Sequence, residues 1–157
     1  MAITPFIKVY EDDDVLVLRD KGAANSTTQD ATASDTVVSE YTSGQGISAL
    51  QLVYVDPTDG RIYPSDSTDS TCAGKIIGIA TNTVGASGEQ VSVITHGQLC
   101  DPSFSFNTAG DACLYANGVN GQFSQTAPLG PHFNLSIGQI TASDCVFVDM
   151  GDPIVRN

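Results

Sequence analysis

The chain has 157 residues and a net charge of −12, from 6 basic and 18 acidic side chains. This length suits one domain able to bury a hydrophobic core, and such an excess of carboxylates repels phosphate backbones, so nucleic acid is not expected as a partner. No apolar run approaches the roughly 20 residues that span a bilayer, and the first residues lack the pattern of a signal peptide, so we expect no membrane partner and synthesis in a reducing cytoplasm.

Residues 1–46 differ in composition from the rest of the chain. The apolar runs "PFIKVY" and "VLVLRD" come first, and a stretch rich in Ala, Ser, Thr and Asp follows them. This composition predicts an extended N-terminal arm and loop, ordered mainly by the surface on which it lies. A long surface loop on a monomer is the alternative. The candidate contact residues are the apolar side chains of the arm: Pro5, Phe6, Ile7, Val9, Tyr10, Val15, Leu16, Val17 and Leu18.

Residues 47–157 contain short apolar runs between turn residues. The runs are "LQLVYV", "KIIGIA", "VSVI", "CLYA" and "CVFV". Runs of this length are typical of strands, and no long stretch has the apolar spacing of a helix. We therefore predict an all-β domain, a compact β-barrel or sandwich.

A repeat is visible within this domain, between residues 50–97 and 111–152. In the two hairpins, Tyr54 corresponds to Tyr115 and Gly60 to Gly121, both at an offset of 61. Further on, "IGIAT" matches "IGQIT" at an offset of 60, and "VSV" matches "VFV" at an offset of 55. The shared order predicts a duplicated β unit. Chance similarity within the small alphabet of β-rich sequences is the alternative.

The turns of both hairpins have residues suited to their conformation. "DPTDG" and "ANGVNG" provide Pro to preset φ and then Asp, Asn and Gly at positions that need a positive φ. Two tight hairpin turns are therefore expected at equivalent places.

The four cysteines are Cys72, Cys100, Cys113 and Cys145. Their spacing is irregular, and no C-x-x-C pair or neighbouring histidine pair accompanies them. Without a secretory signal, this pattern favours mainly buried thiols in a reducing compartment over a disulfide framework.

Motifs of catalytic, cofactor-binding or metal-binding sites are weak in this sequence. The match "GQGISA" to a dinucleotide-binding turn begins at Gly44, but no buried strand precedes it and no helix pattern follows. His96 and His132 each stand alone, without metal-ligand spacing. We therefore expect no catalytic residue, no cofactor and no metal site.

Clustered carboxylates remain as candidates for acid/base chemistry. Asp56, Asp59, Asp66 and Asp69 lie in turn sequences, and none fits a calcium-binding loop. We expect them to be solvated turn residues. A small hydrolase or sugar-binding enzyme that uses them is the alternative.

The stretch from "ISALQLVYVDPTDGRIYPSD" through "CAGKIIGIATNTVGASGEQVSVITHGQLCDPSFSF" and "GDACLYANGVNGQFSQTAP" to "VFVDMGDPIV" resembles a domain of tailed-bacteriophage structural proteins. Such domains occur in capsid decoration proteins, head fibres and the ends of tail fibres. The resemblance covers about residues 47–155 and leaves the arm outside.

The resemblance implies a non-enzymatic virion protein on the capsid exterior that decorates and reinforces the shell. Its expected partners are the major capsid protein and itself, as a homotrimer or a dimer, because capsid sites have local three-fold or two-fold symmetry. Attachment is expected through the N-terminal arm and through strand edges. A receptor-binding head fibre, tail fibre or spike protein that contacts the host surface is the alternative.

Overall fold

The computed structural model describes residues 36–129 and 133–155, and the statements below concern these residues. All of their regular structure is strand, so they include no helix that could cross a membrane. The all-β prediction is confirmed. The expected contact residues between positions 5 and 18, and His132, lie outside the described residues.

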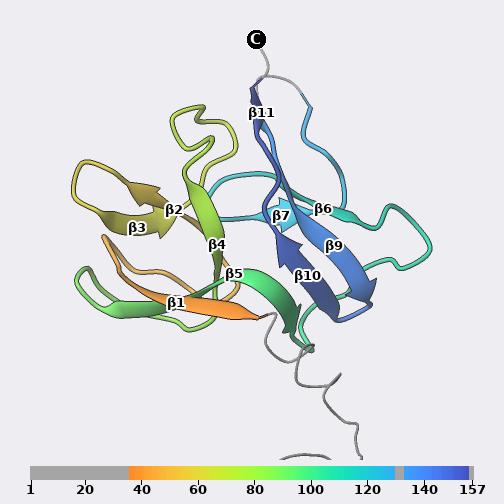
Figure 1. Cartoon of the computed structure of the whole chain (residues 1–157), viewed down its shortest axis with the longest axis horizontal. Coiled ribbons are helices and arrows are strands. Elements are labelled where there is room, and N and C mark those ends of the chain that lie inside the picture. The colour runs from red at the N-terminus through yellow and green to blue at the C-terminus, as the bar shows by residue number, and fades with distance from the viewer. Residues whose placement is uncertain (1–35, 130–132, 156–157) are drawn as a thin grey trace, which may run out of the picture. The chain divides into compact units, whose positions relative to one another are not determined.

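Eleven short strands make up this part of the chain (Figure 1). They are β1 (Val37–Thr42), β2 (Leu52–Asp56), β3 (Arg61–Pro64), β4 (Ile76–Ala80), β5 (Gln90–Cys100), β6 (Cys113–Ala116), β7 (Phe123–Ser124), β8 (Phe133–Asn134), β9 (Ser136–Ala142), β10 (Cys145–Asp149) and β11 (Ile154–Val155).

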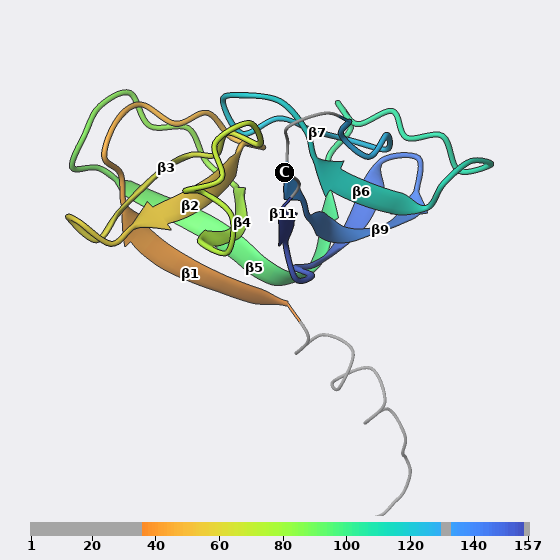
Figure 2. The ribbon, with the colours of Figure 1, turned by 90° about the horizontal axis from the view of Figure 1, so that it is seen from above.

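Nine of these strands form one antiparallel sheet. Its order is β3-β2-β4-β5-β10-β9-β6-β7, and β1 pairs with β5 in addition. The sheet curls into a half-barrel (Figure 2), and β8 and β11 form a separate two-stranded ribbon. The expected barrel or sandwich thus takes the form of one strongly curled sheet.

The strand order is the same in the two predicted repeats. The first repeat has the order β3-β2-β4-β5, and the second repeat has the matching order β7-β6-β9-β10. The two meet at β5 and β10, the only strand pairing that joins them among the described strands. Figure 2 shows the two repeats side by side.

Local irregularities recur at the same places in both repeats. The β2–β4 register shifts between Val53 and Tyr54, and the β6–β9 register shifts between Leu114 and Tyr115, again at an offset of 61. Two backbone hydrogen bonds of the first repeat also have equivalents in the second. The Val55 N–H donates to the Lys75 carbonyl (3.1 Å), as the Ala116 N–H does to the Leu135 carbonyl (3.0 Å). The Ala80 N–H donates to the Gln51 carbonyl (2.8 Å), as the Ile140 N–H does to the Ala112 carbonyl (2.6 Å). A chance similarity of composition would not place register shifts at equivalent positions in two halves, because these shifts depend on backbone geometry.

The sequence alignment of the last strand was wrong by two residues. Ala80 pairs with Val93 in the first repeat, and its equivalent Ile140 pairs with Val146 in the second. Val146 is therefore equivalent to Val93 and not to Val91, which makes the offset 53. Side chains alternate with a period of two in a strand, so a slip of two residues leaves the apolar pattern unchanged.

The sheet begins before the expected domain boundary at residue 47. β1 lies in the segment that was expected to be arm and loop, yet it pairs with β5 from Val37–His96 to Thr42–Gln90. Ser43 bridges to Ile62, and the Gly44 N–H donates to the Ile62 carbonyl (2.9 Å). β1 therefore connects β5 to β3, and the strands β1-β5-β4-β2-β3 close into a ring. Few β1 side chains are buried, so hydrophobic runs did not indicate this strand.

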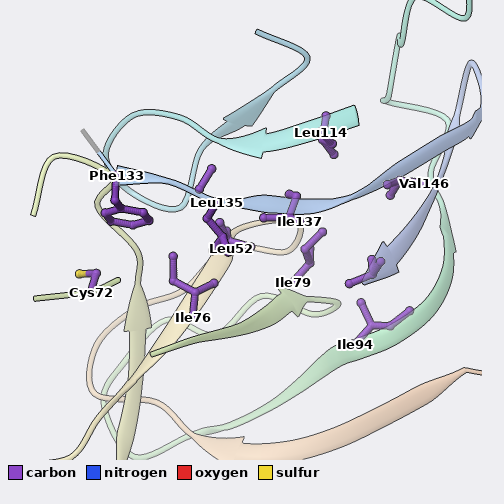
Figure 3. Close-up of a cluster of buried hydrophobic side chains, with 12 residues drawn as sticks. Leu52, Cys72, Ile76, Ile79, Ile94, Leu114, Phe133, Leu135, Ile137 and Val146 are labelled. Atoms are coloured by element: carbon purple, nitrogen blue, oxygen red, sulfur yellow. The ribbon is translucent and has the colours of Figure 1, made fainter. Parts of the chain in front are cut away.

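Two hydrophobic clusters fill the fold. The smaller cluster lies within the ring and contains Ile47, Val53, Ile62, Ala80, Val84, Val91 and Val93. The larger cluster combines side chains of both repeats, as Figure 3 shows. Its members are Leu52, Cys72, Ile76, Ile79, Ile94, Leu114, Ala116, Phe133, Leu135, Ile137, Val146 and Val148. The repeats thus bury their apolar faces in one shared core.

The expectation of mainly buried thiols is wrong for two of the four cysteines. Cys100 of β5 and Cys145 of β10 form a disulfide, with Cα atoms 4.1 Å apart. Cys72 is a buried thiol and Cys113 a half-buried one. The bonded pair lies directly opposite in the β5–β10 register, a proximity that depends on strand order and is invisible in linear spacing.

Candidate functional site

The first candidate surface is the place where the N-terminal segment enters the domain. β1 begins beside the junction of the two repeats, because Val37 pairs with His96. Val37 and Val38 are 46% and 51% exposed. Gly97 has a φ of 113°, and a Cβ at this position would lie 2.5 Å from the Cα of Thr36. The entry point is therefore packed tightly against the sheet while two apolar side chains face solvent.

A histidine and a carboxylate lie at the centre of the junction. His96 Nδ1 is 3.5 Å from Asp149 Oδ1, and these side chains are 44% and 71% exposed. The His96 ring also meets the edge of the Phe147 ring at a centroid distance of 5.1 Å. His96 and Asp149 are equivalent in the two repeats, at the offset of 53, and they face each other. At this exposure the pair adds little stability, so it marks the two-fold relation between the repeats rather than a buried charge site.

The clustered carboxylates shape their own turns. Each accepts a backbone N–H from two residues further on: Thr58 to Asp56 (2.8 Å), Arg61 to Asp59 (3.0 Å), Thr68 to Asp66 (2.8 Å) and Thr71 to Asp69 (2.9 Å). These are Asx-turns, which agrees with the solvated-turn interpretation. Among the described residues, no group of three His, Cys, Asp or Glu side chains is placed to hold a metal ion.

The turn at Asp69 leads to a testable prediction about the pKa of its carboxyl group. The hydroxyl of Thr71 donates to Asp69 (2.7 Å), and this bond together with the Thr71 N–H holds the pKa of Asp69 below its ordinary value of 3.8. A lowered pKa in the folded state gives stability that is present above the ordinary value and lost as the pH falls through the folded one.

Thr71→Ala removes the hydroxyl donor, so the Asp69 pKa should rise toward 3.8. A carboxyl-detected NMR titration measures this value. The Asp101 carboxyl, whose pKa is lowered by the Ser103 hydroxyl, is the internal control and should not move. An unchanged Asp69 midpoint would contradict this account of the turn.

An apolar surface that the sequence did not indicate lies on the β8–β11 ribbon and its approach. Ile154 and Val155 of β11 are 65% and 51% exposed, and Leu129 is 76% exposed. Val155 pairs with Phe133, whose own side chain is buried. The dipeptide "IV" after Pro153 was the only available signal, and it is too short to predict a strand.

Two of the hollows on the surface of the described domain are large enough to hold a small ligand. One, of about 470 Å³, follows β9 and β10 and is lined by Gln139, Phe147 and Asp149 among others. The other, of about 600 Å³, lies where the β6–β7 turn of the second repeat meets Leu50 and Gln51 before β2. The larger hollow is built from both repeats, a location where binding sites often form.

Comparison with known proteins finds no matching protein-family model, curated protein or solved structure.

Proposed function

We propose that this chain is a non-enzymatic structural protein of a tailed bacteriophage that decorates and reinforces the capsid. It is made in the bacterial cytoplasm and binds the major capsid protein on the exterior of the virion. One observation carries the proposal: the N-terminal segment joins the domain at β1, against the junction of two linked repeats. A pull on this segment is therefore transmitted into β5, the longest strand of the sheet.

Strand edges support attachment near the same place. Two edges of the described sheet are open for most of their length: β7 ends the strand order, and β1 pairs with β5 alone until Ser43, just after it, bridges to β3. Such edges present backbone donors and acceptors that an added strand can pair with. Val37 and Val38 give the β1 edge an apolar component that a partner would bury.

The strong negative charge also fits a virion protein. A net charge of −12 keeps free subunits apart and discourages binding to the viral genome. We further propose that the subunit assembles as a homotrimer, or as a dimer, in keeping with the local symmetry of capsid sites. The receptor-binding alternative is favoured by one observation, the larger hollow, which is considered in the next subsection.

Co-sedimentation with expanded capsids that lack the protein tests this proposal. The full chain should bind, and deletion of residues 1–20, which removes the apolar candidates Phe6 and Leu16 with their neighbours, should weaken binding about tenfold or more. Deletion of residues 23–32 is the matched control, because it shortens the polar stretch and keeps both apolar runs.

The control deletion should retain binding. Failure of the full chain to bind would overturn the proposal, and equal binding by the chain without residues 1–20 would overturn the role of the N-terminal segment. Circular dichroism of each variant separates loss of attachment from loss of fold.

A further inference from the structure

The larger hollow has a fixed floor made by contact between the repeats. The Gly121 carbonyl accepts the Leu52 N–H (2.9 Å), and the Gly121 N–H donates to the Ser65 carbonyl (2.7 Å). A Cβ at Gly121 would lie 2.6 Å from the Leu52 oxygen, so only glycine permits this approach. Gln51 Nε2 adds a hydrogen bond to the Asn120 carbonyl (2.8 Å). The hollow is therefore formed before any ligand arrives.

The walls contain two residues whose backbone lies in the left-handed region. Leu50 has a φ of 70° and Asn120 a φ of 55°, and they are the only described non-glycine residues with a positive φ. Both line this hollow. A left-handed conformation is unusual for leucine in particular, and such strain gathers at ligand sites when the surrounding structure holds it in place.

The lining is uncharged although the chain is strongly acidic. No Asp, Glu, Lys, Arg or His lines the hollow, and side-chain amides come from Gln51, Asn117, Asn120 and Gln122. In the described residues the amides of Asn120 and Gln122 make no hydrogen bond with another group. Each offers two donors and an acceptor. An ion would find no counter-charge here, whereas a neutral group with hydroxyls would find partners.

An aromatic ring completes the surface. Phe123 is half-buried and lies in the hollow, held edge-on by Phe104 at a centroid distance of 6.2 Å. Phe123 packs against the larger cluster, so its position is fixed and a ligand that contacts it costs little side-chain freedom. An apolar ring beside free amides matches a molecule with C–H groups on one face and hydroxyls at its rim.

We propose that this hollow binds an uncharged saccharide. Hydroxyls pair with the amides of Asn120 and Gln122, and the C–H face of a sugar ring lies on Phe123. The inference goes beyond capsid attachment and does not rest on it, because the hollow belongs to the folded domain and the N-terminal segment is not part of it. A shallow hollow that a few side chains line implies weak binding, with a dissociation constant of about 1 mM.

Amide NMR of the full ¹⁵N-labelled chain tests the proposal. The probes are neutral oligosaccharides: maltotetraose, galactobiose, mannotriose, chitotetraose and a rhamnose disaccharide. At least one should shift the side-chain NH₂ signals of Asn120 and Gln122 and the backbone signal of Gly121. Free sialic acid, an anionic monosaccharide, should cause no shift because the site has no cation.

Two variants remove the amides without disturbing the floor. Asn120→Gly accepts the positive φ, and Gln122→Ala lies at an exposed position; each should reduce affinity about fivefold or more. Gln139→Ala is the matched control, because it removes an exposed amide from the other hollow and should leave affinity unchanged.

Three results would overturn the proposal. These are no shift with any neutral probe, shifts confined to other surfaces, and shifts caused by an uncharged peptide such as N-acetyl-trialanine amide while every saccharide fails. None of these results bears on capsid attachment, so the two proposals fail separately.

Discussion

Replacing Gly78 or Gly138 with alanine is expected to lower the free energy of unfolding by about 3 kcal/mol in each case. A Cβ at Gly78 would lie 2.1 Å from the Ile94 carbonyl oxygen, and one at Gly138 would lie 2.2 Å from that of Phe147. Both obstacles are backbone atoms of the neighbouring strand, which cannot move aside without breaking the sheet. Urea denaturation measures the loss as a lower midpoint.

Equal losses of unfolding free energy for Gly78→Ala and Gly138→Ala would indicate that the two glycines are structurally equivalent. Gly78 and Gly138 hold the same place in the two repeats, beside β5 and β10 respectively. Gly85→Ala is the control, because nothing lies within 4 Å of its Cβ position, and its effect should stay within about 0.5 kcal/mol. A tolerated alanine at only one of the two equivalent positions would contradict a structural duplication.

Loss of the Cys100–Cys145 disulfide is expected to cost roughly 4 kcal/mol, the chain-entropy value for its loop. The sequence separation is 45 residues, and the bond links β5 to β10 at the one strand pairing between the repeats. Without it, the unfolded chain gains freedom and the junction is held by backbone pairing and the shared core alone. Calorimetry of the oxidised chain and of the double variant Cys100→Ala with Cys145→Ala should show a lower Tm for the variant.

Cys113→Ala serves as the comparison, because Cys113 is a half-buried thiol without a disulfide partner. It should retain a melting temperature much closer to that of the parent chain. An unchanged Tm in the double variant, or labelling of Cys100 by a thiol reagent in the native oxidised protein, would show that the bond does not form.

The fold class and the repeat could be predicted because they depend on local signals. Short apolar runs between turn residues predicted strands, and "VNG" predicted a turn with positive φ, which Asn120 and Gly121 adopt at 55° and 71°. β1 could not be predicted in the same way, because its stability comes from pairing with β5 and from Tyr41 packing on the smaller cluster.

Features that depend on strand order were beyond local signals. The Cys100–Cys145 bond requires knowledge that β5 lies beside β10, and the larger hollow combines Gln51 with a turn more than sixty residues away, as the Gln51–Asn120 hydrogen bond across 69 positions shows. The expected contact residues of the arm lie outside the described residues and remain a prediction. Capsid co-sedimentation of the chain that lacks residues 1–20 tests them.

The location of the protein in a cryo-electron microscopy reconstruction of the intact particle tests the proposed function most directly. We expect density for the curled two-repeat domain on the outer face of the capsid, with the chain before Thr36 leading from β1 to the shell. Absence of the domain from the capsid, or its presence only at the tip of the tail, would rule out a capsid decoration protein.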